Sequence, residues 1–332
     1  MKIRKMKTKD LEVVSQVLAD AFYRWRKQKR GKNSVKRIRP VAQLKPYLQA
    51  EPDGCFVSIK NRNICGGIFS HTWGKQGWIG TFGVSPEIQN QGIGKELLQA
   101  SINYLDKQQN VTHLGLETMK DSPKNIGFYC QMGFKPAFQT FSLIKPIICT
   151  SQKDVEYHNF CKENNIEIGY LSKQKDKFQD IFTRCTWLAS KMVNGLDHRR
   201  EMKIIVENKF GEVIILYKDD FIIGYAICRI ESRYKNRAEP YLDVRVLVID
   251  PDSISKQLFD IFLYECEKYG EEKNKTGIKI RINSSYWVAF NYLLEKGFSI
   301  KGGILRMIKY SEIIQAFDYS KDWLVLCSQW SM

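Results

Sequence analysis

An internal repeat of about 164 residues narrows the folds that are open to this chain. Gly133-Phe134 and Gly297-Phe298 each follow a helical stretch, and the offset of 164 residues between them also aligns Val84 with Val248. A repeat longer than about 50 residues indicates two copies of one domain rather than a solenoid. A chain of 332 residues is also long for a single core. We expect two similar domains, residues 1–148 and 149–332, the second ending in a tail.

Hydrophobic periodicity predicts how each copy is organised. Residues 8–22 and 93–105 have apolar side chains at helical spacing, with Thr8 or Asp10 as an N-cap for the first of these helices. KNRN at 60–63 lies between two β-rich runs and predicts a hairpin, as does DD at 219–220 in the second copy. The resulting order of elements predicts an α/β fold in which each copy has a mixed, mostly antiparallel, twisted sheet flanked by helices.

Charge and composition restrict the partners. The formal net charge is +16, and residues 24–39 hold nine basic residues and no acid. Such a run is typical of sites for nucleic acid, an acidic acceptor or cofactor phosphates, and equally of a solvated loop, so these alternatives stay open.

No apolar run approaches the roughly 20 residues of a membrane helix, and no signal-like segment follows the basic N-terminus. We therefore expect a cytoplasmic protein without a membrane partner. The nine cysteines and four histidines are too scattered for a metal site, and the cysteine spacing does not suit a disulfide framework.

A glycine-containing turn is the strongest local signal in the first copy. VSPEIQNQGIGK at 84–95 leads from a strand into a helix, with Gly92 and Gly94 at the junction. Bare backbone amides at the start of a helix form a site for anions, especially phosphates. The turn lacks both the Gly-Lys-Ser/Thr ending of nucleotide hydrolases and the three-glycine dinucleotide fingerprint.

Together with NIGFYCQMGF at 125–134, this turn resembles the GNAT acetyltransferase family. That family has Gln/Arg-x-x-Gly-x-Gly/Ala after its fourth strand, and then Asn and Tyr on the helix before a Gly-Phe. The resemblance covers residues 1–145 and implies an acyltransferase that moves an acetyl group from acetyl-coenzyme A to a primary amine by direct attack. The acceptor would be a small-molecule or peptide amine, which the sequence does not identify.

The resemblance also implies roles for particular residues. The cofactor would contact Phe82, Val84, Gln89, Gln91, Gly92, Ile93, Gly94, Lys95, Asn125 and Phe128. Tyr129 matches the general acid of the family. Many members carry an acid on the fourth strand, but QGWIGTF at 76–82 offers none, so Glu117 and His71 are the candidate bases. Arg24, Trp25 and Arg26 fall where this family builds the wall of its acceptor site.

The second copy lacks this set of residues. Its corresponding turn, VIDPDSISKQLF at 248–259, has no glycine and two aspartates, and Leu293 stands where Tyr129 does in the first copy. We expect a degenerate copy that does not catalyse. Three alternatives stay open: an aminoacyl or peptidyl transferase of the two-domain type that uses charged RNA, a non-catalytic coenzyme A sensor, and a nucleic-acid-binding protein. A homodimer is also open, since the apolar tail with Trp323 and Trp330 could cover the second sheet or a partner.

Overall fold

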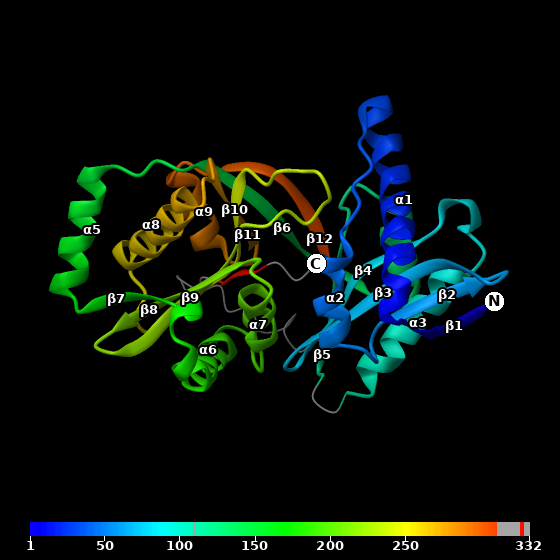
Figure 1. Ribbon diagram of the computed structural model, residues 1–332, viewed down its shortest axis with the longest axis horizontal. Helices are drawn as coiled ribbons and strands as arrows, with labels where there is room; N and C mark the ends of the chain where they lie inside the picture. The colour runs from blue at the N-terminus through cyan, green and yellow to red at the C-terminus, as the bar shows by residue number, and fades with distance from the viewer. Residues whose placement is uncertain (109–110, 311–325, 329–332) are drawn as a thin grey trace.

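The computed structural model describes residues 1–108, 111–310 and 326–328, and Figure 1 shows their arrangement as two halves side by side. The first half contains β1 (Lys2–Lys5), α1 (Leu11–Arg30), α2 (Val41–Ala50), β2 (Phe56–Lys60), β3 (Asn63–Trp73), β4 (Gln76–Val84), α3 (Ile93–Asp106), β5 (His113–Thr118), α4 (Pro123–Gln131) and β6 (Lys135–Pro146). The second contains α5 (Ser151–Glu163), β7 (Ile166–Tyr170), α6 (Phe178–Met192), α7 (Arg199–Glu207), β8 (Gly211–Lys218), β9 (Phe221–Arg229), β10 (Tyr241–Ile249), α8 (Lys256–Glu272), β11 (Gly277–Asn283), α9 (Trp287–Glu295), β12 (Ser299–Tyr310) and β13 (Leu326–Ser328).

The repeat is present in the structure. The bounds of α4 and α9, and those of β6 and β12, differ by the same 164 residues at both ends. Gly133 and Gly297, which follow the two helices, share a φ of +86°. Ahead of its hairpin the second copy also contains β7, α6 and α7, in the order that β1, α1 and α2 have in the first copy.

Both predicted hairpins are present as two-residue turns. Asn61 and Arg62 connect β2 to β3 with φ angles of 50° and 66°, and Asp219 and Asp220 connect β8 to β9 with φ angles of 49° and 64°. Two successive left-handed residues are the signature of a type I′ turn, whose twist matches that of the flanking strands.

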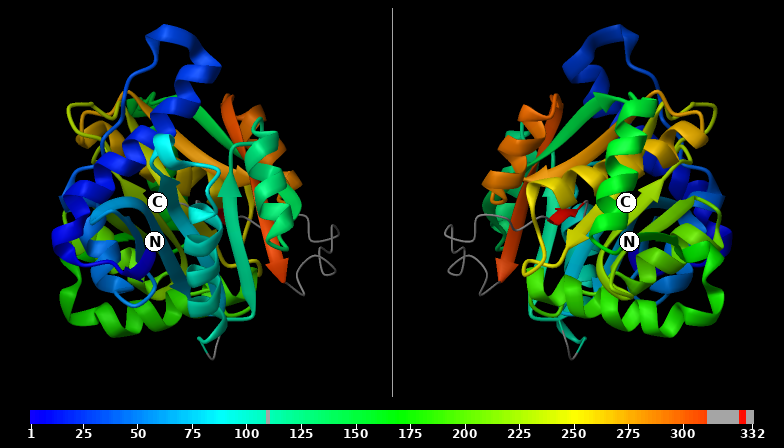
Figure 2. Two further views of the ribbon diagram at one scale, coloured as in Figure 1. Left: turned by 90° about the vertical axis from the view of Figure 1, so that its right-hand side faces the viewer. Right: turned by 90° about the vertical axis from the view of Figure 1, so that its left-hand side faces the viewer.

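The two copies exchange their last strands within one continuous sheet. The strand order is β1-β2-β3-β4-β5-β12-β6-β11-β10-β9-β8-β7, with β13 paired to β10. Thus β12 of the second copy lies between β5 and β6 of the first, and β6 pairs with β11 of the second. Figure 1 shows β6 and β12 running between the two halves, and the end-on view in Figure 2 shows β12 beside β5. The sheets that we expected as separate are therefore joined.

Within each copy, two parallel strands separate part-way along their length. β4 pairs with β5 only from Gln76 to Ile79, and β10 pairs with β11 only from Tyr241 to Val244. Beyond these points the first copy has an opening between β4 and β5. In the second copy β13 pairs with β10 from Val246 to Val248, so the chain itself lies against the separated end of β10.

Part of the basic segment 24–39 is helical, although a solvated loop was one of the alternatives that the sequence left open. α1 continues to Arg30 because Arg, Lys and Gln are good helix formers, and it ends at Gly31, whose φ is +70°. The end of α1 extends beyond the sheet (Figure 1). No helix among the described residues is long and apolar enough to cross a bilayer. Trp323 and Trp330 lie outside the described residues.

Candidate functional site

The opening between β4 and β5 belongs to a cavity of about 910 Å³. Its walls come from α1, the separated end of β4, the glycine turn, the start of α3, and α4 with the residues before it. Most of the residues that the sequence singled out line it: Arg24, Trp25, Phe82, Val84, Gln89, Gly92, Ile93, Gly94, Lys95, Asn125, Phe128 and Tyr129. Positions more than 100 residues apart in the chain thus meet at one site.

The glycine turn presents bare backbone to this cavity. Gly92 is the N-cap of α3 in the left-handed conformation, with φ of +80°, and no side chain caps the helix. The first amides of a helix have no partner within the helix, so here they are available to a ligand. A Cβ at Gly92 would meet no atom within 4 Å, and one at Gly94 would make only ordinary contacts, with Phe82 at 3.4 Å, Phe128 at 3.8 Å and Val84 at 3.9 Å. Packing alone therefore does not require glycine at position 94.

Polar contacts hold the turn in place. The side-chain amide of Gln89 donates to the carbonyl of Val84 at 3.0 Å, and Arg24 donates to the carbonyl of Pro86 at 2.7 Å. Gln91 accepts a hydrogen bond from Lys60 at 2.6 Å and does not line the cavity. Gln89 and Arg24 thus fix the conformation of the turn, whereas Gln91 ties it to β2.

Two of the aromatic residues that line the cavity, Tyr129 and Trp25, carry a polar atom. Tyr129 is half-buried between Phe128 and Phe134, with ring centroids 5.2 and 6.2 Å away. Burial raises the pKa of its phenol above the ordinary value, so the hydroxyl is protonated at neutral pH. The indole Nε1 of Trp25 is buried and has no hydrogen-bond partner among the residues that the structure describes. Both residues line the cavity, Tyr129 from α4 and Trp25 from α1.

Neither candidate base lies at the cavity. His71 is buried on β3, where it stacks on Trp73 at 5.4 Å; burial, followed by the charge of Arg200, lowers its pKa to about 3. Glu117 accepts hydrogen bonds from Thr140 at 2.8 Å and Arg306 at 3.0 Å. Their strand positions turn both side chains into the protein, which sequence alternation by itself did not reveal. Arg26 also lies outside the lining.

Other lining residues had no separate signal in the sequence. Helix α1 contributes Phe22, Gln28 and Lys29, and the segment before α4 contributes Asp121 and Ser122. An ion pair of 3.5 Å joins Lys29 to Asp121 across two of these walls. Only the extension of α1 to Arg30 brings Lys29 here, and the helical pattern of its charged end was too weak to predict that.

The second copy has no comparable cradle. Helix α8 is capped by Ser255, whose hydroxyl accepts from the amide of Leu258 at 3.1 Å. Asp250 at the mouth of the turn accepts from Lys191 at 2.8 Å, and Leu293 is fully buried in the core. With β13 beside β10 as well, this copy has a side-chain cap on its helix and a leucine where the first copy has its phenol. Within the described part of the chain, no three His, Cys, Asp or Glu residues are placed to hold a metal ion.

Comparison with known proteins gives a family match for part of the first half and the fold of nearly the whole chain. Residues 19–134 match the sequence profile of the acetyltransferase (GNAT) family. No curated protein sequence matches the chain significantly.

Solved structures match nearly the whole chain. A tandem GNAT protein from the clavulanic acid biosynthesis pathway is 13% identical with a TM-score of 0.57, covering 92% of this chain and 97% of that one. A GCN5-related N-acetyltransferase from Sphaerobacter thermophilus is 9% identical with a TM-score of 0.55, covering 93% and 95%. A glucosamine N-acetyltransferase region of a fungal multi-domain β-N-acetylglucosaminidase is 12% identical with a TM-score of 0.66, covering 92% of this chain and 38% of that one. At these identities the likeness concerns the fold alone.

Proposed function

Because residues 19–134 match the GNAT family of acetyltransferases, we propose that the first half of the chain transfers an acetyl group from acetyl-coenzyme A to a primary amine by direct attack. One observation carries this proposal: the uncapped start of α3 and the hydroxyl-bearing Tyr129 line the same cavity of about 910 Å³. A site for a phosphate and a group able to protonate a leaving sulfur are the two parts that this reaction requires.

The residues fit the coenzyme in charge and shape. Its pyrophosphate would accept hydrogen bonds from the amides of residues 92–95, with the partial positive charge of the α3 N-terminus and Lys95 beside it. Its amide-containing pantetheine arm would lie along the separated end of β4, which has no partner strand on the β5 side there. Asn125 lines the cavity and would be a side-chain donor for its carbonyl groups.

Bound acetyl-coenzyme A supplies an activated thioester carbonyl. The chain's backbone at Phe82 and Val84 would orient that carbonyl, and the acceptor nitrogen would attack its carbon as the C–S bond breaks. Tyr129 would give its proton to the departing sulfur, whose ordinary thiol pKa is about 8.5. The nitrogen must be neutral to attack, which at pH 7 costs roughly 4 to 5 kcal/mol for an amine of pKa about 10.4. The nitrogen's own proton is lost to water or a base that we do not assign.

Calorimetric titration of acetyl-coenzyme A tests the proposal. Wild-type protein is expected to bind one molecule per chain, and Gly92→Glu to abolish binding, because its carboxylate would lie among the amides and repel the pyrophosphate. Gly297→Glu is the matched control: it has the same left-handed backbone, with φ of +86°, and the same open space around its Cβ, but it lies in the second copy.

Equal binding by wild type and both variants would remove the glycine turn from the site. Two molecules bound per chain would mean that the second copy is also a coenzyme site, and no binding to wild-type protein would contradict the proposed reaction.

A further inference from the structure

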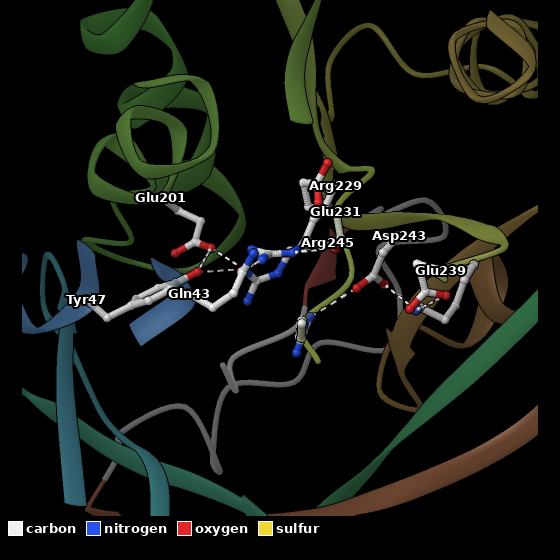
Figure 3. A network of polar contacts seen from close by, with 10 residues as sticks. Gln43, Tyr47, Glu201, Arg229, Glu231, Glu239, Asp243 and Arg245 are labelled. Atoms are coloured by element: carbon white, nitrogen blue, oxygen red, sulfur yellow. Dashed lines mark hydrogen bonds and ion pairs between the residues drawn. The ribbon is translucent and has the colours of Figure 1, made fainter. Parts of the chain in front are cut away.

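A second, smaller cavity of about 10 Å³ lies between the two halves and is lined by Arg39, Gln43, Tyr47, Arg229, Arg233 and Arg245. Gln43 and Tyr47 belong to α2 of the first half, whereas Arg229 and Arg245 come from β9 and β10 of the second (Figure 3). Four of the six lining residues carry a guanidinium group and none carries a carboxylate. A volume of about 10 Å³ is the least that holds one water-sized occupant, so a halide ion or a carboxylate oxygen enters only as the surrounding side chains move apart slightly.

Two of these arginines are paired with acids. Arg245 donates to Glu201 and, at 3.0 Å, to the hydroxyl of Tyr47, and Figure 3 shows its guanidinium beside these two residues. Arg233 forms an ion pair of 3.0 Å with Asp243. Their positive charges are therefore balanced within the protein.

Arg229 is different. It is only 2% exposed, and its recorded partners are all neutral: the side-chain oxygen of Gln43, the backbone carbonyl of Glu231 at 3.1 Å, and the ring of Phe210 at 4.6 Å. Among the described residues, no carboxylate forms an ion pair with it; the acid that acts on it from nearby, Glu201, is already paired with Arg245. A buried charge without an ion-pair partner of its own destabilises a fold, so a bound anion would offset part of that cost.

The positive charges around the cavity shift the pKa values of two neighbouring side chains, Arg229 and Tyr234. Burial, followed by the charges of the neighbouring arginines, lowers the pKa of Arg229 to about 10. Burial would raise the pKa of Tyr234, yet Arg39 and Arg233 bring it down to about 8, which favours the negatively charged phenolate. Both effects follow from cations gathered in a region of low solvent access.

We propose that this cavity binds a small anionic group, of the size of a halide ion or the end of one carboxylate, between the guanidinium groups of the two halves. The group has two sources: a free inorganic anion, or an acidic group on the amine acceptor. The second source rests on the proposed function. It is compatible with the geometry because Arg39 donates a hydrogen bond to Thr81, the residue before Phe82 on β4.

Bromide tests the first source without any enzymatic assay. Sodium bromide is titrated at constant ionic strength, with a bulky sulfonate salt as the balance, and the melting temperature is followed. Wild type is expected to rise by several degrees, and Arg229→Met to give a flat response. Arg229→Lys, which keeps the charge, and Arg237→Met, a matched control at an exposed position, are expected to respond as wild type does. A bromide-soaked crystal should show an anomalous peak inside the cavity.

Paired acceptors test the second source. Acetylation of amines that differ only in an acidic or neutral group, such as 4-aminobutanoate and 4-aminobutanamide, is compared in wild type and Arg229→Met. An acceptor that places its acid in the cavity should have its KM raised about tenfold or more by the substitution, while the neutral member is unchanged.

The outcomes separate the two proposals. A bromide response confined to wild type, Arg229→Lys and Arg237→Met, or a KM change confined to acidic acceptors, supports the anion site. Identical bromide slopes in all four proteins, no peak in the crystal and equal KM ratios would overturn it. If no amine is acetylated at all, the proposed reaction fails, and the bromide experiment alone then decides the anion site.

Discussion

Tyr129 lies half-buried beside Phe128 and Phe134, and its pKa is raised by burial. The same physical effect that keeps this phenol protonated also makes it a weaker acid than a free tyrosine. Proton transfer to a sulfur leaving group therefore depends on close placement and on the charge that develops on the sulfur as the bond breaks. Since the hydroxyl is needed only when the thiolate forms, its loss should slow the reaction without weakening coenzyme binding.

Tyr129→Phe removes that hydroxyl and keeps the ring. We expect kcat to fall by about 10²- to 10⁴-fold, the usual contribution of a general acid, with little change in the dissociation constant of acetyl-coenzyme A. Steady-state kinetics and calorimetry on the same preparation measure the two quantities. A kcat within twofold of wild type would rule out Tyr129 as the acid.

Because His71 and His198 are buried, we expect the free energy of unfolding to fall at acidic pH. They are 2% and 4% exposed, and burial lowers their pKa to about 3 and about 4. Between those values and the unfolded value near 6.5 the unfolded chain binds more protons, so stability falls as the pH drops below 6.5. At pH 5 each histidine should lower the free energy of unfolding by about 2 kcal/mol relative to pH 7.

Urea unfolding at pH 7 and pH 5 measures this loss. His71→Gln is expected to reduce the pH dependence by about 2 kcal/mol, since it removes one titrating group. His158→Gln, at an exposed position on α5, is the control that should leave it unchanged. A pH dependence that is the same in His71→Gln as in wild type would show that His71 does not resist protonation.

Among the elements, equivalent helices in the two copies begin in different ways. α3 starts at the left-handed Gly92 with no side-chain cap, whereas α8 starts at Ser255, which caps it. A serine cap stabilises a helix by about 1 kcal/mol, so the first copy forgoes that contribution where a ligand can take its place. The two copies therefore share the fold of this helix and differ in how its first turn is capped.

The β2–β3 hairpin offers a test of turn chemistry. Arg62 is held at a φ of 66° in a type I′ turn, a conformation that glycine adopts without strain. Arg62→Gly creates the preferred Asn-Gly pair and should raise the free energy of unfolding by about 0.5 to 1 kcal/mol. Denaturant unfolding measures it, with Arg62→Ala as the control that removes the charge and keeps the strain. Equal stability of the two variants would mean that backbone conformation is not the cause.

For the whole molecule, the exchange of β6 and β12 makes the halves depend on each other. β12 covers the edge of β5 and places Met307, which is fully buried, in the same core cluster as Val84 and Ile93, which line the cavity of about 910 Å³. Arg306 on the same strand pairs with the buried Glu117. The residue that the sequence suggested as a base thus has a partner from the far end of the chain.

The fragment of residues 1–148 should therefore not fold alone. Without β12, strands β5 and β6 lose the neighbour that joins them, and buried apolar residues become exposed. Circular dichroism and size-exclusion chromatography of the fragment should show an aggregated or disordered chain, and co-expression with residues 149–332 should restore acetyl-coenzyme A binding. A monomeric 1–148 fragment that binds the coenzyme would contradict this dependence.

Local patterns in the sequence were sufficient for much of the fold and of the site. Both hairpins and the 164-residue repeat lie where the sequence predicted them, because turn chemistry and the spacing of apolar residues depend on residues close together in the chain. The family resemblance selected residues from Arg24 to Tyr129 that meet at one cavity. Residue type alone did not separate Tyr129, which lines the cavity, from His71 and Glu117, which lie in the interior.

Tertiary structure alone decided which strand completes which sheet and which charges face each other between the halves. β6 and β12 occupy equivalent places in the repeat, so their own periodicity cannot tell one sheet edge from the other. That choice depends on the packing of residues far apart in the chain, as does the gathering of Arg39 and Arg229 around one cavity. Periodicity and turn chemistry act over a few residues, whereas strand partners and buried charges are set by contacts that form only when the whole chain is folded.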